Sequence, residues 1–186
     1  MNIINQAIIF ATEAHSGALR KGTVLPYIVH PLETLAIVSG MTDDAEILAA
    51  AVLHDTIEDT ATTKEQLQAV FGDRVTALVC ADTEDKQKDK PAADTWKQRK
   101  QATLDALASE TDIAVKMITL GDKLSNLRCM YADYIKIGDK LWERFNQKDP
   151  AIQAWYYRGI SEAVRELAGF AAWQEYVALL DKVFEA

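Results

Sequence analysis

The residues best suited to chemistry follow an almost wholly apolar stretch. The chain has three histidines, and one of them, His54, lies near the end of AEILAAAVLHD and is followed by TIED. If a helix runs on through this stretch for one more turn, His54 shares a face with Glu58, and Asp55 shares one with Asp59. A buried carboxylate is costly without a partner. The pattern therefore favours a metal or proton-transfer site over the simpler alternative, a polar cap that begins the next loop.

A second polar group interrupts the apolar stretch AVKMITLGDKLSNL. Asp122 and Asn126 stand four residues apart there and would share a helix face. Alone, they would be interpreted as a half-buried polar patch. Together with His30, His54 and Asp55, however, Asp122 completes a set of two imidazoles and two carboxylates. That set suits Mn²⁺, Fe²⁺ or Zn²⁺ with positions left open for water. Such a metal activates water as a nucleophile at neutral pH and neutralises phosphate oxygens.

Basic and aromatic residues are candidates for contacting a substrate. Arg20 and Lys21 precede PYIVHP, where they either hold a phosphate or lie on the surface as ordinary basic side chains. The polar stretch 82–94 carries charges of both signs. Most of them are expected to be solvated, with one or two, such as Lys86, reaching a phosphate. The run WYY that contains Tyr156 is interpreted mainly as core, and an aromatic lid over a base is the minority interpretation.

Helical spacing of apolar residues extends along almost the whole chain, and no alternation of period two is long enough for a strand. Helices are expected from Ile4 to near Gly17, from Pro31 to Gly40, over 45–55, from Thr62 to Phe71, and over 73–81, 95–109, 112–134, 137–146, 151–167 and 172–184. The sequence thus predicts one all-α domain over residues 1–186, a bundle of about eight to ten helices. Its motif-bearing core spans about 1–135, and helices within 136–186 pack on that core.

Several local features of these helices can be predicted as well. Thr42 or Asp43 should cap the helix over 45–55. The inner face of the helix that begins at Pro31 is expected to consist of Leu32, Leu35, Ala36 and Ser39. His15 lies at the end of the first helix, where an imidazolium complements the helix dipole, so it is interpreted as structural.

The composition excludes several classes of protein. The chain has 186 residues, of which 49% are hydrophobic and 26% charged, and its net charge is −8. A general nucleic-acid or anionic-membrane binder would carry the opposite charge. Two cysteines are too few for a disulfide scaffold. The sequence shows neither a secretory signal nor a run long enough to span a membrane. We therefore expect a soluble cytoplasmic protein, and nothing in the sequence indicates its oligomeric state.

Three segments taken together resemble a known family. RKGTVLPYIVHP, AAAVLHDTIEDT and ITLGDKLSNLR occur in this order and at a characteristic separation, over roughly residues 10 to 130. As a set they resemble the HD-type metal phosphohydrolases, and more narrowly the (p)ppGpp hydrolase domain of RelA/SpoT-type enzymes and the small alarmone hydrolases. The family's Thr-Asp-Asp element corresponds here to Asp82-Thr83-Glu84-Asp85-Lys86. Gly121 replaces a frequent alanine, which on the sequence alone is a minor change.

The resemblance implies roles for individual residues. His30, His54, Asp55 and Asp122 would be the metal ligands, and the metal would be Mn²⁺. Glu58 and Asp59 would handle the attacking water and proton transfer. Substrate contacts would come from Arg20, Lys21, Lys86, Asn126 and Tyr156.

The reaction implied by the resemblance removes pyrophosphate from the 3′ position of ppGpp or pppGpp and leaves GDP or GTP. No synthetase-like segment follows, so we expect a hydrolase without synthetase activity. Two alternatives stay open. The first is an HD phosphohydrolase of another nucleotide, such as ppApp, a nucleoside monophosphate or NADPH. The second is a nucleotide sensor without turnover, which the intact Glu58-Asp59 pair disfavours.

Overall fold

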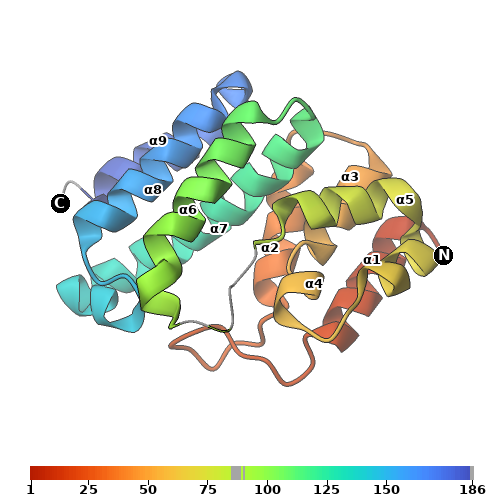
Figure 1. Cartoon of the computed structure of the whole chain (residues 1–186), viewed down its shortest axis with the longest axis horizontal. Coiled ribbons are helices and arrows are strands. Elements are labelled where there is room, and N and C mark those ends of the chain that lie inside the picture. The colour runs from red at the N-terminus through yellow and green to blue at the C-terminus, as the bar shows by residue number, and fades with distance from the viewer. Residues whose placement is uncertain (85–88, 90, 185–186) are drawn as a thin grey trace.

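The computed structural model describes the chain except for residues 85–88, 90 and 185–186, and the described part is all-α (Figure 1). Two 3-10 segments, η1 and η2, accompany nine α-helices within it, and the described residues contain no strand. The predicted fold class is therefore confirmed. The helices are α1 (Ile3–Ala14), α2 (Val29–Val38), α3 (Ala45–Leu53), α4 (Thr56–Asp59), α5 (Lys64–Asp82), α6 (Ala92–Ser109), α7 (Ile113–Ile137), α8 (Pro150–Ala163) and α9 (Ala171–Phe184), with η1 at Gly138–Arg144 and η2 at Arg165–Leu167.

Side-chain caps set the starts of the N-terminal helices. Asp44, rather than Thr42 or Asp43, caps α3, because its carboxylate accepts the amide N–H of Glu46 at 2.9 Å. Thr63 and Gln66 form a reciprocal capping box at the start of α5. The two helices expected on either side of Gly72 are halves of α5. Gly72 adopts φ 82° at the kink between them, a conformation that favours glycine.

The inner face of α2 differs from the face that was predicted. Its buried residues are His30, Pro31, Thr34, Ile37 and Val38, whereas Leu32 is 37% exposed. The prediction was wrong because it assumed that the more apolar face would be buried. In the structure α2 turns a histidine and a threonine toward α7. The buried face therefore mixes apolar residues, Ile37 and Val38, with His30, which belongs to the candidate site.

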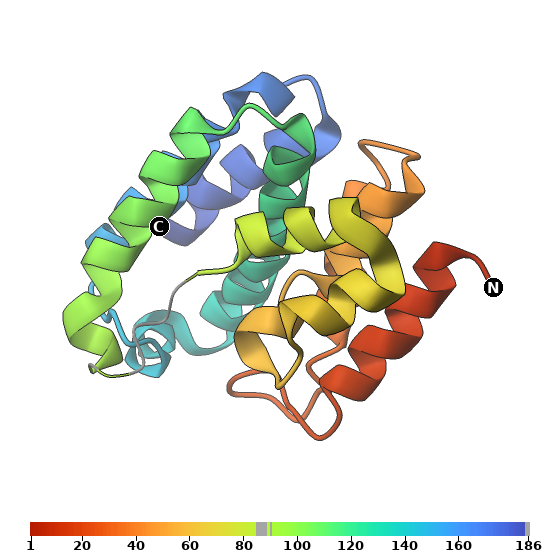
Figure 2. The ribbon, with the colours of Figure 1, turned by 45° about the vertical axis from the view of Figure 1, so that its right-hand side comes forward.

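Helix α7 is the element on which both halves of the molecule pack. Helices α2, α3 and α5 contact it from one side, and α9 and η1 contact it from the other, so α7 lies between the two groups (Figures 1 and 2). The crossing of α2 over α7 is close: a Cβ added at Gly121 would lie 2.7 Å from Val38 Cγ2. An alanine at this position is therefore not a minor change in this chain.

The C-terminal third covers the far side of α7. The segment expected to be a helix over 137–146 is the 3-10 segment η1, which follows Gly138 at φ 56°. Asp149 caps α8 by accepting the amide N–H of Ala151 at 2.8 Å, and Pro150 occupies the first helical position. Helix α8 packs against α6 and α9. The loop predicted over 82–94 is shorter, because α5 extends to Asp82 and α6 begins at Ala92.

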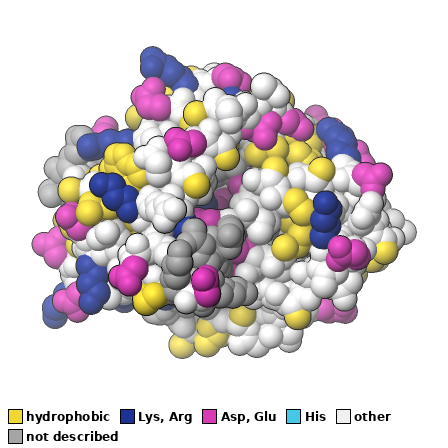
Figure 3. All heavy atoms as spheres, in the orientation of Figure 1, with side chains coloured by type: hydrophobic (Ala, Val, Ile, Leu, Met, Phe, Trp, Pro, Cys, Tyr) yellow, Lys and Arg dark blue, Asp and Glu magenta, His cyan; other side chains and the backbone are white. Residues whose placement is uncertain are grey.

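A hollow separates the two groups of helices on one face of the molecule, and acidic side chains are visible inside it (Figure 3). Among the described residues, no helix combines the length and the apolar character that crossing a membrane would require.

Candidate active site

The two imidazoles of the predicted metal site are buried side by side. His30 lies in the first turn of α2 and is 2% exposed, and His54 follows α3 directly and is 1% exposed. Nδ1 of His54 lies 2.9 Å from the carbonyl oxygen of Ala51. A carbonyl can only accept, so Nδ1 carries a proton, and Nε2 is the nitrogen that faces the cluster and would ligate a metal once deprotonated. Nε2 of His54 is buried and has no hydrogen-bond partner in the described structure.

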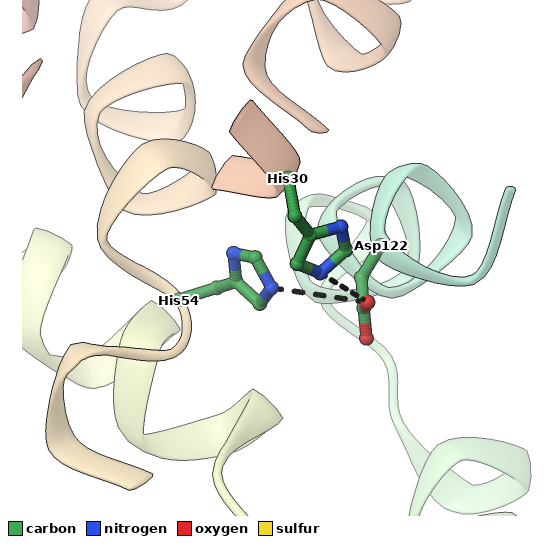
Figure 4. A group of neighbouring side chains, drawn as sticks. All are labelled: His30, His54 and Asp122. Carbon is green, nitrogen blue, oxygen red and sulfur yellow. Dashed lines mark ion pairs between the residues drawn. The ribbon is translucent and has the colours of Figure 1, made fainter. Parts of the chain in front are cut away.

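Two carboxylates face these imidazoles. Asp122, on α7, places Oδ1 3.0 Å from Nε2 of His30 and 3.8 Å from Nε2 of His54 (Figure 4). Asp55 places Oδ2 3.0 Å from Nε2 of His54 and 3.5 Å from Nε2 of His30. Ligand atoms of His30, His54 and Asp122 all lie within 4.8 Å of one another. Imidazole nitrogens and carboxylate oxygens converging on one point form a donor set that suits a divalent metal.

The charges in this cluster shift its pKa values strongly. Burial would raise the pKa of Asp122, but the ammonium of Lys123 and the two imidazoles outweigh burial and hold it well below its usual range. Burial would lower the pKa of His54, yet Asp55 and Asp122 raise it to about 10. The cluster thus binds positive charge firmly. A metal entering it displaces a proton from His54.

The predicted acid pair lies beside the ligands on the single-turn helix α4. Oε2 of Glu58 accepts the amide N–H of Glu84 at 3.0 Å. Oδ2 of Asp59 accepts the phenol of Tyr27 at 3.2 Å, and the same phenol donates to Oδ2 of Asp55 at 2.6 Å. Tyr27 therefore joins a predicted metal ligand to a predicted acid–base residue. Burial and the charge of Asp55 raise the pKa of Tyr27 far above its usual range, so the phenol keeps its proton.

These groups surround one cavity of about 170 Å³. Its wall combines metal-ligand candidates, the acid pair and two lysines. The lining residues are Tyr27, His30, Asp55, Glu58, Asp59, Asp82, Glu84, Lys100, Thr103, Thr119, Asp122, Lys123, Asn126 and Tyr156. A small cavity that holds both acids and ammonium groups can bind an anion and transfer protons next to it.

A second cavity of about 200 Å³ adjoins the first through Asn126. The predicted basic pair, Arg20 and Lys21, lies in its wall. Arg20 donates to Oδ1 of Asn126 at 3.1 Å, and Nδ2 of Asn126 donates to Oδ1 of Asp122 at 2.6 Å. Asn126 therefore connects the basic cavity with the metal cluster.

The remaining predicted substrate contacts have different outcomes. Tyr156 lines the first cavity, where its ring lies under the ammonium of Lys100 at 4.9 Å. Its hydroxyl is buried and has no hydrogen-bond partner in the described structure, which leaves it ready for a ligand. Burial raises the pKa of this hydroxyl above its usual range, so the phenol keeps its proton. Lys86 lies outside the described residues.

Sequence reasoning missed several residues that line the cavity. Asp82, Glu84 and Lys100 belong to segments whose charges were expected to be largely solvated, yet Glu84 pairs with both Arg99 and Lys100 at the cavity wall. Lys123 pairs with Asp122. Because these acidic and basic residues nearly cancel in charge, the sequence did not indicate that they gather at one cavity. Tyr27, within PYIVHP, gave a usable signal because it is the only side chain between Pro26 and His30 that can donate a hydrogen bond.

His15 is structural, but it is not the imidazolium that was expected. It is 5% exposed, and its ring lies 4.8 Å from the ring of Tyr27. Burial lowers its pKa, which disfavours the imidazolium form.

Similarity to known proteins supports the geometry. The family model described as HD domain matches residues 7–145. The chain is 38% identical over 131 residues to guanosine-3′,5′-bis(diphosphate) 3′-pyrophosphohydrolase MESH1 of Danio rerio, and the match covers 68% of each chain. It is 39% identical over 135 residues to a Vibrio cholerae protein named as the same pyrophosphohydrolase, covering 69% of this chain and 18% of that one. GTP pyrophosphokinase rsh of Brucella ovis is 35% identical over 131 residues.

Solved structures share the fold. The crystal structure of lmo0812 from Listeria monocytogenes EGD-e matches with a TM-score of 0.73 and 28% identity, over 84% of this chain and 99% of that one. A metazoan ortholog of SpoT, described as hydrolysing ppGpp, matches with a TM-score of 0.77 at 23% identity, over 98% and 95% of the two chains. The chain spans only 17% of the length of longer relatives such as the Brucella protein. By its sequence match and its helical architecture, this chain belongs to the HD-domain family.

Proposed function

We propose that this chain is a metal-dependent phosphohydrolase that removes the 3′-pyrophosphate from ppGpp or pppGpp, yielding GDP or GTP and pyrophosphate. The observation that carries the proposal is that two cavities share Asn126 in their walls: one is lined by His30, Asp55, Asp122 and the acid pair, and the other by Arg20 and Lys21. A nucleotide that carries phosphate groups on both its 3′ and its 5′ positions suits such a pair, because each cavity has basic side chains in its wall. The names of the Danio rerio and Vibrio cholerae relatives support the same substrate.

The metal in this proposal is Mn²⁺, held by His30, His54, Asp55 and Asp122. When bound, a divalent cation supplies Lewis-acid catalysis, since it activates water and neutralises phosphate charge. The two imidazoles are preset for this role because hydrogen bonds at Nδ1 leave both Nε2 atoms facing the cluster. Nε2 of His54 is buried and faces both Asp55 and Asp122, so these donor atoms would converge on one cation.

The chain's own residues supply the rest of the chemistry. Glu58 or Asp59 accepts a proton from the attacking water. The water oxygen bonds to the 3′-phosphorus while the bond from that phosphorus to the ribose 3′-oxygen breaks, and the 3′-oxygen takes up a proton. Lys100 and Lys123 face the cavity and offset the charge of the departing pyrophosphate. Arg20, Lys21 and Tyr156 hold the nucleotide.

Product analysis tests the proposal directly. The protein is incubated with Mn²⁺ and ppGpp, and the products are separated by ion-exchange chromatography. GDP and pyrophosphate should appear, and a chelator should abolish both. No turnover of ppGpp would overturn the assignment. Parallel reactions with ppApp, nucleoside monophosphates and NADPH then distinguish another phosphohydrolase from a binding protein, because a monoesterase releases inorganic phosphate and a sensor releases nothing.

A further inference from the structure

A chain of hydrogen bonds leads from His30 to the C-terminal helix α9. Nδ1 of His30 lies 2.8 Å from Oγ of Ser125, which donates to Oε2 of Glu33 at 2.7 Å. Arg128 donates to Oε1 of Glu33 at 3.0 Å and, through two nitrogens, to the carboxylate of Glu175 at 2.6 and 2.7 Å. The contacts thus join α2, α7 and α9, which are far apart in sequence.

The direction of each bond follows from what the groups can donate. A carboxylate only accepts, so the single proton of the Ser125 hydroxyl goes to Glu33. Oγ of Ser125 must then accept, and the N–H at Nδ1 of His30 is the donor. This arrangement places the N–H of His30 on the side away from the cluster and turns Nε2, the nitrogen that would ligate a metal, toward Asp122 (Figure 4).

Burial distinguishes this chain of contacts from an ordinary surface ion pair. Arg128 and Glu33 are 38% and 34% exposed at their side chains, and ion pairs of that exposure add little to stability. Ser125, however, is fully buried. Removing its hydroxyl would leave a buried N–H of His30 without an acceptor, which carries the full desolvation cost. The important contact of Glu33 is therefore the one with Ser125.

We propose that Glu33 is a positioning residue for His30, that it acts through Ser125, and that Arg128 and Glu175 hold Glu33 in place. The proposal rests on the proposed function only in taking His30 as a metal ligand. A carboxylate behind a ligating imidazole fixes the ring's orientation and makes its other nitrogen more basic. A residue of the C-terminal helix α9 thereby supports a metal site whose ligands all lie before residue 123.

Metal affinity measured without substrate tests the role of Ser125. Mn²⁺ is titrated into each protein, and the free ion is followed by electron paramagnetic resonance. Ser125→Ala should weaken binding by about 10- to 100-fold, the range for partners behind a metal ligand. Ser161→Ala is the matched control, because Ser161 is also buried but its hydroxyl donates to the carbonyl of Arg158 on α8. Unchanged affinity in Ser125→Ala, or an equal loss in both variants, would overturn the proposal.

A double-mutant cycle tests whether Glu33 acts through Ser125. Glu33→Gln should weaken Mn²⁺ binding about 10-fold in the natural chain and leave it unchanged when Ser125→Ala is already present. If the charge of Glu33 acted directly on the metal, the loss would be the same in both backgrounds, and the proposed path would be wrong. Glu162→Gln, which removes an exposed ion pair with Arg165 elsewhere on the surface, should leave affinity unchanged.

Turnover separates positioning from general damage. At saturating Mn²⁺, Ser125→Ala should recover most of its kcat, with the KM for ppGpp unchanged. A kcat that stays low at saturating metal would show damage beyond metal binding and overturn the positioning role. The titrations contain no nucleotide, so a failure of ppGpp as substrate leaves the affinity result intact. Natural protein that binds no Mn²⁺ at all would overturn both proposals.

Discussion

Lys123 offsets the concentration of negative charge in the cavity. Asp122 is buried, the half-buried Asp55 and Asp82 line the same cavity, and uncompensated carboxylates in such a place would bind protons instead of a metal. Lys123 pairs with Asp122 and is itself held positive, because that carboxylate raises its pKa well above the usual range despite burial. The charges around Asp55 and Asp122 thus hold the pKa values of both carboxyls below their usual range, whereas burial raises the pKa of Asp82.

Substitution of a ligand and of an acid should have separable effects. We expect Asp55→Ala to lose metal binding and turnover together, because it removes a carboxylate that contacts both imidazoles. Glu58→Gln should keep the metal, since its amide oxygen can still accept the N–H of Glu84, and should lower kcat by about 10²- to 10⁴-fold. Calorimetric metal titration and initial rates measure the two effects. A Glu58→Gln protein with near-natural kcat would remove the acid–base role.

The sequence was sufficient to identify the ligand candidates, but it did not identify the residues that surround them. His30, His54, Asp55 and Asp122 interrupt apolar stretches, and a polar group there requires a partner, so their convergence could be predicted. Glu84 and Lys100 lie among charges of both signs, and nothing in a sequence separates a solvated pair from one that closes a cavity. Contacts such as the one between Tyr27 and Asp55 depend on how helices cross, which local patterns do not encode.

At the scale of single elements, Asp44 caps α3, and part of its contribution to the free energy of unfolding depends on its charge and can be measured. Asp44 accepts two amide N–H groups and also pairs with Arg74 at 2.8 Å, and the bond from Arg74 contributes most to lowering its pKa. Asp44→Ala should cost about 1 kcal/mol in urea unfolding at neutral pH. Asp44→Asn keeps the cap and should cost less, because the ion pair is largely exposed.

The pH dependence of this cap follows from the direction of the shift. A lowered pKa in the folded state means that the carboxylate stabilises the fold above its unfolded value of about 4, and that this contribution is lost as the pH falls through the folded value. The difference between the natural chain and Asp44→Asn should therefore shrink on acidification. A difference that is constant with pH would contradict the charge-dependent part.

The crossing of α2 over α7 should be sensitive to a single methyl group. We expect Gly121→Ala to destabilise the fold and to weaken metal binding. Overpacking costs about 1–3 kcal/mol, helix propensity returns at most about 1 kcal/mol, and any separation of the helices moves His30 from Asp122. The neighbours of the new Cβ would be Val38 and Thr34, which are both buried and β-branched.

Gly159→Ala in α8 provides the comparison, and thermal unfolding measures both variants. Its Cβ would meet only the flexible end of Leu104, at 2.6 Å, so it should be tolerated better. Equal stability of the two variants would show that α2 and α7 can move apart to accept the methyl group at little cost in free energy.

Across the whole molecule, metal and fold should be linked. The ligand candidates come from α2, the end of α3, and α7, so a bound cation ties these elements together and favours the folded state. At 100 times its dissociation constant, Mn²⁺ should stabilise the protein by about 2.7 kcal/mol. Differential scanning calorimetry should show Tm rising with Mn²⁺, and Asp55→Ala should lack the rise. An equal rise in that variant would place the stabilising ion elsewhere.

The fold class and the helix bounds could be predicted wherever the helical spacing of apolar residues was sufficient evidence. An all-α chain follows directly from the spacing of apolar residues, and most helix bounds agree within a few residues. The segment after Gly138 was expected to continue as α-helix, but seven residues between two helices form the tighter η1. How α9 packs back on α7 could not be inferred, because the apolar face of a helix does not identify its partner.

The middle of α7 has a consequence for hydrogen exchange. Every residue from Ala114 to Asp122 is buried, so these amides have no route to solvent through local opening. We expect deuterium uptake there to require global unfolding and to report its free energy, whereas the exposed loop around Leu19 and Val24 should exchange much faster. Faster uptake along this stretch would reveal a partial opening. Asp122 thus lies in the stretch that we expect to open last, so this candidate metal ligand keeps its position through all smaller openings of the fold.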